Sequence, residues 1–290
     1  MTDYTNKETI IENFDWNQLS LEQLKSLQSQ INKAINLKKH DSKLAQSNCN
    51  LAQGHGYKAT LAKVFPHQLR SSLSEYQKCV FIISLGSKNF VDRRRLRASI
   101  KWISKNFKAC IALVGDSLYR LTLEVKDYAK DDEYRSKAFD IGQEFVNENK
   151  FLFEEYSESC DFEFKLASEI EKQPNFEVYH QEFQSLYKSS ESFAKLVNSF
   201  ADTYLSRGKS IKEGEVEARL HRKKQLAIAY LFEESALFTC LAQEGWLVFV
   251  YPGSIKTFEE IAEGLHSEVP LFLKKIIWVS LRLKKKVTAR

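Results

Sequence analysis

A run of five apolar residues, 79–83, constrains the fold of this chain more than any other feature. Such a run, preceded by Lys78 and followed by Ser84 and Gly86, is typical of a strand buried on both faces inside a parallel sheet. Ser84 would then stand at the carboxyl end of that strand, where open α/β sheets bind ligands. Taken alone, the stretch favours a simpler interpretation, in which Ser84 only caps a helix or turns the chain.

Similar segments recur along the chain. Apolar runs predict further strands at 57–64, 109–114, 162–166, 246–251 and 276–283. Helical spacing separates them at 91–107, 126–159, 215–241 and 256–265, and one long helix with an aromatic stripe is expected beyond Pro174. We interpret that stripe, from Tyr179 to Tyr204, as core and not as a binding surface. Strands that alternate with helices predict an α/β fold with a Rossmann-like parallel sheet flanked by helices.

The first 56 residues differ from the rest. Residues 15–39 carry leucines and isoleucines at helical spacing after a cap-like Ser20, and the polar stretch that follows predicts a linker. We therefore expect an amino-terminal helical extension and linker over 1–56 and one domain, large enough to bury a full core, over 57–290. A signal-peptide core and a run of about eighteen apolar residues are both absent from the sequence, which predicts a soluble, cytoplasmic protein.

Charge, cysteines and motifs narrow the possible functions. The 43 basic and 38 acidic residues leave a net charge of +5, so polyanion binding would need local clusters. The five cysteines have no CxxC spacing and predict buried, reduced thiols. The sequence has no HExxH motif and neither of the glycine-rich signatures for dinucleotides or phosphates, so we expect no metal and no cofactor.

Three further polar side chains are candidates for the same site, two on one predicted helix and one at a strand end. Tyr230 and Glu234 are four residues apart, so they share one face of a predicted helix. A carboxylate in such an apolar stretch is costly unless it has a partner or a task. Tyr251 ends a late apolar run and therefore stands at the carboxyl end of another strand.

This set of residues resembles the active site of the tRNA-dependent cyclodipeptide synthases. In that family a nucleophilic serine follows an apolar strand in a serine, any residue, glycine context, which Ser84 and Gly86 match. A tyrosine and a glutamate four residues apart match Tyr230 and Glu234, and a tyrosine that ends a late strand matches Tyr251. The resemblance covers residues 57 to the carboxyl terminus and implies a fold like the catalytic domain of class I aminoacyl-tRNA synthetases of the tyrosine and tryptophan type.

Two positions indicate a branch of that family. Ser87 occupies the fourth position of the serine motif, where one branch has asparagine, and Pro252 follows Tyr251, where that branch has histidine. The chain therefore resembles the other branch, in which the fourth residue varies and Tyr-Pro ends the late strand. How this branch orients its serine is open, since the Ser87 hydroxyl or the backbone N–H groups of the following helix could do it.

The resemblance implies a two-donor mechanism. Ser84 attacks the ester of one aminoacyl-tRNA, and the aminoacyl-enzyme then reacts with a second aminoacyl-tRNA before the dipeptide leaves as a cyclic diketopiperazine. Glu234 and Tyr230 would hold the α-amino group, with Glu234 relaying a proton, and Tyr251 would orient the reacting centre. Aminoacyl-tRNAs are the expected partners, and we expect a monomer.

Two larger sets of residues complete the predicted site. Strand ends at 84 and 115 are expected to form the pocket floor, and the apolar character of most of the pocket predicts a hydrophobic first amino acid. The substrate-binding set is Val80, Ile82, Gly86, Ser87, Leu113, Gly115, Asp116, Leu237, Phe249 and Pro252. The predicted tRNA contacts are Arg94, Arg97, Lys101, Lys105, Arg219, Arg222, Lys223 and Lys224.

Two alternatives remain open from the sequence. A serine hydrolase or acyltransferase of α/β type would use Ser84 with His266 as its base, although the GxSxG motif is absent. A non-enzymatic RNA-binding module would explain the basic clusters, but it would not explain why Tyr230, Glu234 and Tyr251 converge on the strand ends.

Overall fold

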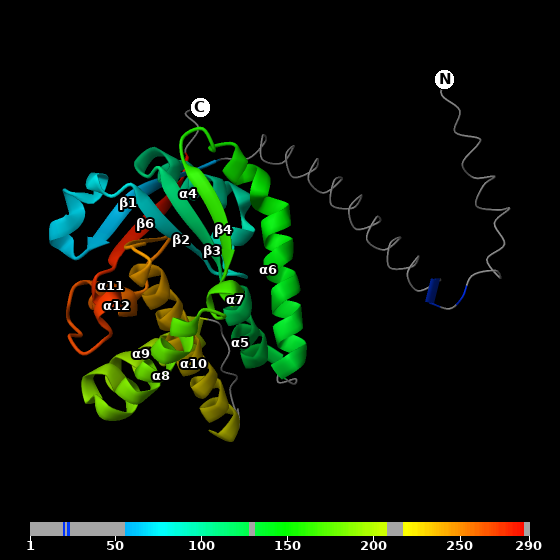
Figure 1. Cartoon of the computed structure of the whole chain (residues 1–290), viewed down its shortest axis with the longest axis vertical. Coiled ribbons are helices and arrows are strands. Elements are labelled where there is room, and N and C mark those ends of the chain that lie inside the picture. The colour runs from blue at the N-terminus through cyan, green and yellow to red at the C-terminus, as the bar shows by residue number, and fades with distance from the viewer. Residues whose placement is uncertain (1–19, 21, 24–55, 128–130, 208–216, 287–290) are drawn as a thin grey trace. The chain divides into compact units, whose positions relative to one another are not determined.

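The computed structural model describes residues 20, 22–23, 56–127, 131–207 and 217–286, and it divides the chain into two units, Met1–Gly54 and His55–Arg290 (Figure 1). In the first unit, the backbone N–H of Ser20 donates to Gln23 Oε1 at 2.9 Å, and the backbone N–H of Gln23 donates to Ser20 Oγ at 3.3 Å. This reciprocal pair is a capping box, as expected for a helix that begins at Ser20. The rest of that predicted helix and the linker lie outside the described residues.

The second unit is built on a six-stranded sheet with the order β1-β6-β5-β2-β3-β4 (Figure 1). The strands are β1 (Tyr57–Phe65), β2 (Lys78–Ile83), β3 (Ala109–Val114), β4 (Asp161–Leu166), β5 (Val248–Tyr251) and β6 (Ile277–Lys285). Strands β2 to β6 pair in parallel, as predicted, but β1 pairs antiparallel with β6. The sheet is therefore mixed, with its antiparallel strand at an edge, a position that tolerates such pairing.

Strand β2 is buried on both faces, which confirms the interpretation of the run 79–83. Val80 and Ile82 join one hydrophobic cluster with residues of α5 (Asp116–Asp127), α9 (Glu191–Arg207) and α10 (Glu217–Gln243). Cys79, Phe81 and Ile83 join a second cluster on the opposite face, with residues of α4 (Arg93–Asn106) and α6 (Asp131–Glu154). Because β2 lies between β5 and β3, its carboxyl end opens at the middle of the sheet.

The remaining helical elements are short except for one. They are η2 (His67–Arg70), η3 (Leu73–Glu75), α3 (Lys88–Val91), α7 (Ala167–Ile170), α8 (Pro174–Ser189), α11 (Lys256–Ala262) and α12 (Leu271–Lys274). Two predictions need correction. The helical region expected over 126–159 is α6, and the separate helix α5 begins earlier, at Asp116. The long helix expected beyond Pro174 is two helices, α8 and α9, separated at Ser190.

Ser190 explains that break. Its backbone is extended, with φ −110° and ψ 114°, and its hydroxyl accepts a hydrogen bond from the backbone N–H of Phe193 at 3.2 Å. The same hydroxyl donates to Glu268 Oε1 at 3.1 Å. Ser190 therefore ends α8 and caps α9, as serine often does at a helix amino terminus.

Helix α10 is the hydrophobic centre of the second unit. Within the described part of the chain it is long and apolar enough to span a membrane, but 83% of its most apolar 18-residue stretch is buried inside the protein. Packing against α8, α9 and the sheet accounts for that composition. The four described cysteines, Cys79, Cys110, Cys160 and Cys240, are buried and free, as predicted.

Candidate active site

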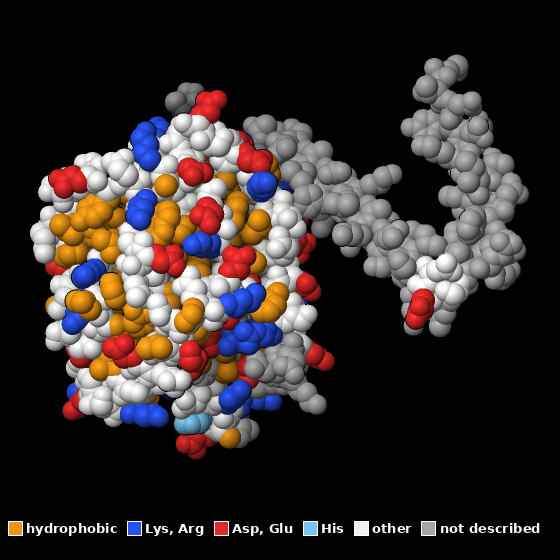
Figure 2. All heavy atoms as spheres, in the orientation of Figure 1, with side chains coloured by type: hydrophobic (Ala, Val, Ile, Leu, Met, Phe, Trp, Pro, Cys, Tyr) orange, Lys and Arg blue, Asp and Glu red, His pale blue; other side chains and the backbone are white. Residues whose placement is uncertain are grey.

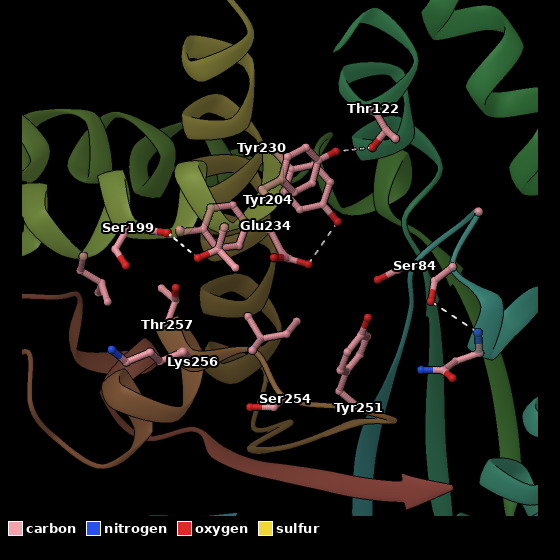
Figure 3. Close-up of a pocket in the computed structure, with 18 of the residues that line it drawn as sticks. Ser84, Thr122, Ser199, Tyr204, Tyr230, Glu234, Tyr251, Ser254, Lys256 and Thr257 are labelled. Carbon is pink, nitrogen blue, oxygen red and sulfur yellow. Dashed lines mark hydrogen bonds between the residues drawn. The ribbon is translucent and has the colours of Figure 1, made fainter. Parts of the chain in front are cut away.

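A cavity of about 950 Å³ lies at the carboxyl ends of β2 and β5 (Figure 3). Its wall comes from the loops that follow these two strands and from helices α3, α5, α9, α10 and α11. Ser84, Tyr230, Glu234 and Tyr251 all line it. In Figure 3 the polar ends of these four side chains face a common space, so the fold brings together residues that lie up to 167 positions apart in the sequence.

Ser84 follows β2 directly and begins a tight turn. The backbone N–H of Ser87 donates to the Ser84 carbonyl at 3.2 Å, and Gly86 has φ +78°, a conformation that favours glycine. A Cβ atom at Gly86 would lie 2.9 Å from the hydroxyl of Tyr119, so a larger residue there would also require the Tyr119 side chain to shift. The Ser87 hydroxyl accepts a hydrogen bond from the backbone N–H of Asn89 at 3.5 Å and so caps α3.

Glu234 is the most unusual group in the cavity wall. Its side chain is 2% exposed, and its Oε2 atom has no hydrogen-bond partner among the described residues. Burial raises the pKa of Glu234 from 4.5 to about 8, although a hydrogen bond from Tyr230 works in the opposite direction. With that pKa, the carboxyl is largely protonated at neutral pH when the cavity is empty.

Tyr230 lines the cavity with Glu234 and Ser84. Its hydroxyl donates to Glu234 Oε1 at 3.5 Å, and Ser84 lies near enough to oppose slightly the rise in the pKa of Tyr230. Burial, followed by the negative charge of Glu234, raises the pKa of Tyr230 well above its ordinary value. Tyr230 is therefore a neutral phenol that donates to the buried carboxyl and lines the same cavity as the candidate nucleophile.

Tyr251 reaches the same space from β5. Backbone pairing between β2 and β5 ends at Phe81 and Val250, so it does not extend to Ser84 and Tyr251 themselves. Beyond that point a side chain joins the two loops, because Asn89 Nδ2 donates to the Pro252 carbonyl at 2.5 Å.

Asn89 is itself held in place by an arginine. Its Oδ1 atom accepts from Arg95 Nη1 at 3.1 Å, and the Arg95 guanidinium lies 4.4 Å from the centre of the Tyr57 ring. Both ends of the Asn89 amide are therefore engaged, and Asn89 fixes the spacing between the loop that carries Ser84 and the loop that follows Tyr251.

Helix α9 contributes two aromatic side chains that the sequence interpretation assigned to the core. Phe200 and Tyr204 line the cavity, and both pack on Tyr230, with ring centres 6.3 and 5.2 Å away. The Tyr204 hydroxyl is 2.6 Å from Thr122 Oγ1, and burial raises the pKa of Tyr204 to about 12. The helical spacing of Phe200 and Tyr204 was a visible signal, but it did not distinguish a cavity wall from a core.

The predicted substrate-binding set is divided by the structure. Gly86, Ser87 and Pro252 line the cavity. Five others are fully or almost fully buried in the core and do not line it: Val80, Ile82, Leu113, Leu237 and Phe249. These residues lie beneath the cavity, because α10 covers that face of the sheet up to the ends of the strands.

Gly115 and Asp116 also lie outside the cavity wall, contrary to the expected pocket floor. The Gly115 N–H donates to the Ile83 carbonyl at 3.1 Å, which continues the pairing of β2 and β3. The Asp116 carboxylate accepts from the backbone N–H and the hydroxyl of Ser168, at 3.0 and 2.6 Å. Asp116 therefore joins the start of α5 to α7 and has a structural contact in place of a ligand.

Several of the predicted tRNA contacts form ion pairs within the protein. Arg94 pairs with Asp92 at 3.1 Å, and Arg222 with Glu124 at 2.6 Å. Arg97 pairs with Glu155, Lys224 with Asp202, and Lys223 is buried. Lys101, Lys105 and Arg219 are exposed on their helices. On the face drawn in Figure 2, basic and acidic side chains lie beside one another.

His266 lines the same cavity as Ser84. Its Nε2 atom lies 3.6 Å from Glu260 Oε2 and its Nδ1 atom 3.9 Å from Glu268 Oε1. Within the described ranges His266 Nδ1 has no hydrogen-bond partner and Nε2 lies beside Glu260, so neither ring nitrogen pairs with Ser84 as in a serine hydrolase. In the part of the chain that the structure describes, no three His, Cys, Asp or Glu side chains form a cluster that could hold a metal ion.

Solved structures share this fold. A cyclodipeptide synthase from Fluoribacter dumoffii matches with a TM-score of 0.68 and 24% identity, over 80% of this chain and all of that one. A cyclodipeptide synthase from Candidatus Glomeribacter gigasporarum, bound to Phe-tRNAPhe, matches with a TM-score of 0.57 and 17% identity, over 77% of this chain and 94% of that one.

A third match extends the comparison to another class of enzyme. A Mycobacterium tuberculosis protein, whose structure relates cyclodipeptide synthetases to type I tRNA synthetases, has a TM-score of 0.54 and 14% identity, over 80% of this chain and 94% of that one. No protein-family model and no curated protein matches the sequence. The structural matches confirm the predicted α/β fold, with a central sheet flanked by helices.

Proposed function

We propose that this protein is a cyclodipeptide synthase that makes a diketopiperazine from two aminoacyl-tRNAs. The observation that carries the proposal is the convergence of Ser84, Tyr230, Glu234 and Tyr251 in one cavity of the shared fold. Residues 57–290 would form the catalytic domain. We place the reaction in the cytoplasm, because aminoacyl-tRNAs are made there.

The first half-reaction loads the serine. Ser84 Oγ bonds to the carbonyl carbon of an aminoacyl-tRNA, the ester bond to the terminal ribose breaks, and the serine proton leaves with the ribose oxygen. The Tyr230 hydroxyl lines the same cavity as Ser84 and could orient this oxygen once the substrate is bound. The donor is already an activated ester, so the transfer consumes no ATP.

The second half-reaction builds the ring. The amine of the aminoacyl-enzyme attacks the ester of a second aminoacyl-tRNA, which forms a peptide bond and releases the second tRNA. The new terminal amine then attacks the ester to Ser84, which closes the diketopiperazine and restores the serine hydroxyl.

Glu234 suits the amine in both half-reactions. An α-ammonium group would provide the partner that Oε2 lacks, and its positive charge would favour the ionised carboxyl. The resulting carboxylate can take a proton from the ammonium when the amine must become a nucleophile. Its pKa of about 8 is close to that needed for proton exchange with an α-amino group.

Ser87 and the Tyr251-Pro252 pair support the branch with Tyr-Pro on the late strand. Since the Ser87 hydroxyl caps α3, the bond from Asn89 to the Pro252 carbonyl is a better candidate for positioning the serine loop in this chain.

Apolar side chains support a hydrophobic amino acid for at least one of the two positions. The residues predicted for this role are core, but Leu85, Val125, Leu196 and Phe200 line the cavity and provide an equivalent surface. Products that contain only charged amino acids would contradict this part of the proposal.

The test is expression of the full chain in a bacterium and mass spectrometry of the medium. New diketopiperazines should appear, and they should disappear with Ser84→Ala but persist with Ser157→Ala, which changes an exposed serine outside the cavity. Purified protein incubated with labelled aminoacyl-tRNA should become labelled at Ser84. Hydrolysis of the ester without a cyclic product would indicate a hydrolase, and binding without turnover would indicate an RNA-binding module.

A further inference from the structure

Four lysines surround the candidate active site. Lys88 begins α3, Lys126 lies in the last turn of α5, Lys195 in the second turn of α9, and Lys256 begins α11. All four residues are exposed, and all four line the cavity that contains Ser84. We call this set the lysine rim. Four separate helices contribute to it, so no single basic sequence cluster could have revealed it.

The lysine rim is open to a ligand. Lys195 and Lys256 make ion pairs, but each pairs with a glutamate one helical turn away, Glu191 at 2.7 Å and Glu260 at 3.2 Å. Exposed pairs of this kind are weak and easily exchanged. Lys126 lies 6.0 Å from the centre of the Tyr119 ring, at the outer limit of a cation–π contact.

The rim differs from the arginines predicted to bind tRNA. Arg97 makes a two-point contact with Glu155, and Arg222 pairs with a glutamate that is 10% exposed. Arginine pairs with such geometry are held more firmly than a lysine on its own helix. Part of the positive charge of the strongest basic sequence clusters is therefore neutralised by ion pairs within the protein.

The position of the rim indicates which part of a nucleic acid it would bind. In Figure 3, Lys256 lies across the cavity from Ser84, with Glu234 and Tyr251 between them. If an ester carbonyl lies at Ser84, the ribose and phosphates of the same nucleotide must leave through the mouth of the cavity. Ammonium groups around that mouth suit phosphates as point charges that need no fixed geometry.

We propose that the lysine rim binds the backbone phosphates of the single-stranded 3′ end of aminoacyl-tRNA. This inference rests on the proposed function and deepens it. The rim admits the aminoacylated end to Ser84, whereas the amino acid itself is bound by the residues inside the cavity. Glu260, which pairs with Lys256 and lies 3.6 Å from His266 Nε2, is an acidic group in the same cavity wall that the phosphates would displace from Lys256.

The experiment replaces all four rim lysines by glutamine in the full chain. A matched control replaces four exposed lysines that do not line the cavity: Lys137, Lys150, Lys172 and Lys188. Both variants change the net charge from +5 to +1, so they differ only in where the charge is removed. Each protein is tested for aminoacyl-tRNA binding at several salt concentrations and for acylation of Ser84.

Acylation is measured with two donors: aminoacyl-tRNA, and a small aminoacyl ester that has no phosphate. The rim variant should bind aminoacyl-tRNA with a salt slope that is smaller by about 0.7 for each phosphate that the protein no longer neutralises. Its acylation by aminoacyl-tRNA should fall at least tenfold, whereas acylation by the small ester should stay within twofold of the unmodified protein. The control variant should keep both rates and the salt slope.

Two outcomes would overturn the inference. One is a rim variant whose salt slope and tRNA-dependent rate equal those of the control variant. The other is an equal decrease with both donors, which would mean that the substitutions damage the cavity itself. Failure of the proposed function is recognised separately, because the unmodified protein would then form no aminoacyl-enzyme with either donor, and both proposals would fall together.

Discussion

Replacing Glu234 by glutamine should make the protein more stable than the unmodified protein, by a margin that grows as the pH rises. The same substitution should abolish acyl transfer. The carboxyl is 2% exposed, and its Oε2 atom has no hydrogen-bond partner among the described residues. Burial raises its pKa from 4.5 to about 8. Folding therefore disfavours the ionised form, and glutamine removes that ionisation while it can still accept the Tyr230 hydrogen bond.

The size of the effect follows from the pKa shift. The folded-state pKa is the higher one, so the stability present below pH 4.5 is lost as the pH rises towards 8. Each pKa unit corresponds to about 1.4 kcal/mol, so the raised pKa destabilises the folded state by on the order of 3 kcal/mol at pH 7 and by about 5 kcal/mol above pH 8, relative to an unfolded chain in which Glu234 is ionised. At pH 4.5 the cost is close to zero. The advantage of Glu234→Gln should grow by these amounts across that range.

Urea unfolding of both proteins at pH 5, 6, 7 and 8 would measure this difference, with Glu158→Gln as a control for removal of an exposed carboxylate. The control should run parallel to the unmodified protein, whereas the Glu234→Gln curve should diverge from it with increasing pH. If the two curves stay parallel, Glu234 does not carry a raised pKa and our account of the amine-binding carboxyl is wrong. If the variant is less stable at every pH, the carboxyl has a structural partner that outweighs its burial.

Two further substitutions test the geometry around Ser84. Asn89→Asp keeps the acceptor for arginine but removes the donor to the Pro252 carbonyl, so acylation should slow by about 10- to 100-fold with little change in aminoacyl-tRNA affinity. Asn149→Asp makes the same exchange on a carbonyl of α6 and should leave acylation unchanged; equal rates in the two variants would argue against a positioning role. Gly86→Ala should lower the melting temperature more than Gly264→Ala, since both have positive φ but only Gly86 would place a Cβ 2.9 Å from a tyrosine hydroxyl. Equal shifts would show that only backbone strain matters there.

The parts of the site that could be predicted are those set by local patterns. The run 79–83 has the composition of a strand buried on both faces, which places Ser84 at its carboxyl end. The spacing of Tyr230 and Glu234 puts them on one helical turn, whatever the rest of the chain does. Tyr251 follows an apolar run in the same way as Ser84, and neighbouring parallel strands bring the two ends together.

The parts that could not be predicted depend on contacts between distant segments. A helical stripe shows that Phe200 and Tyr204 are turned inward, but only the partner helix decides whether a core or a cavity lies there. At the break between α8 and α9, the Ser190 hydroxyl donates to Glu268, which is 78 residues away. Likewise, the charge of Arg97 is committed to Glu155, 58 residues further along the chain.

Two features that conflict with stability lie in the wall of this cavity. Glu234 is a buried carboxyl with an oxygen left unbonded among the described residues, and Gly86 holds a turn that other residues would strain. By contrast, the buried Asp116 accepts two hydrogen bonds from Ser168, and the buried Glu233 forms a two-point contact with Arg120. A sequence free to maximise stability would replace Glu234 by a neutral residue, as the glutamine prediction states. A buried acid without a positively charged partner among the described residues, placed where a serine and two tyrosines converge, is best explained by a ligand that carries the missing positive charge.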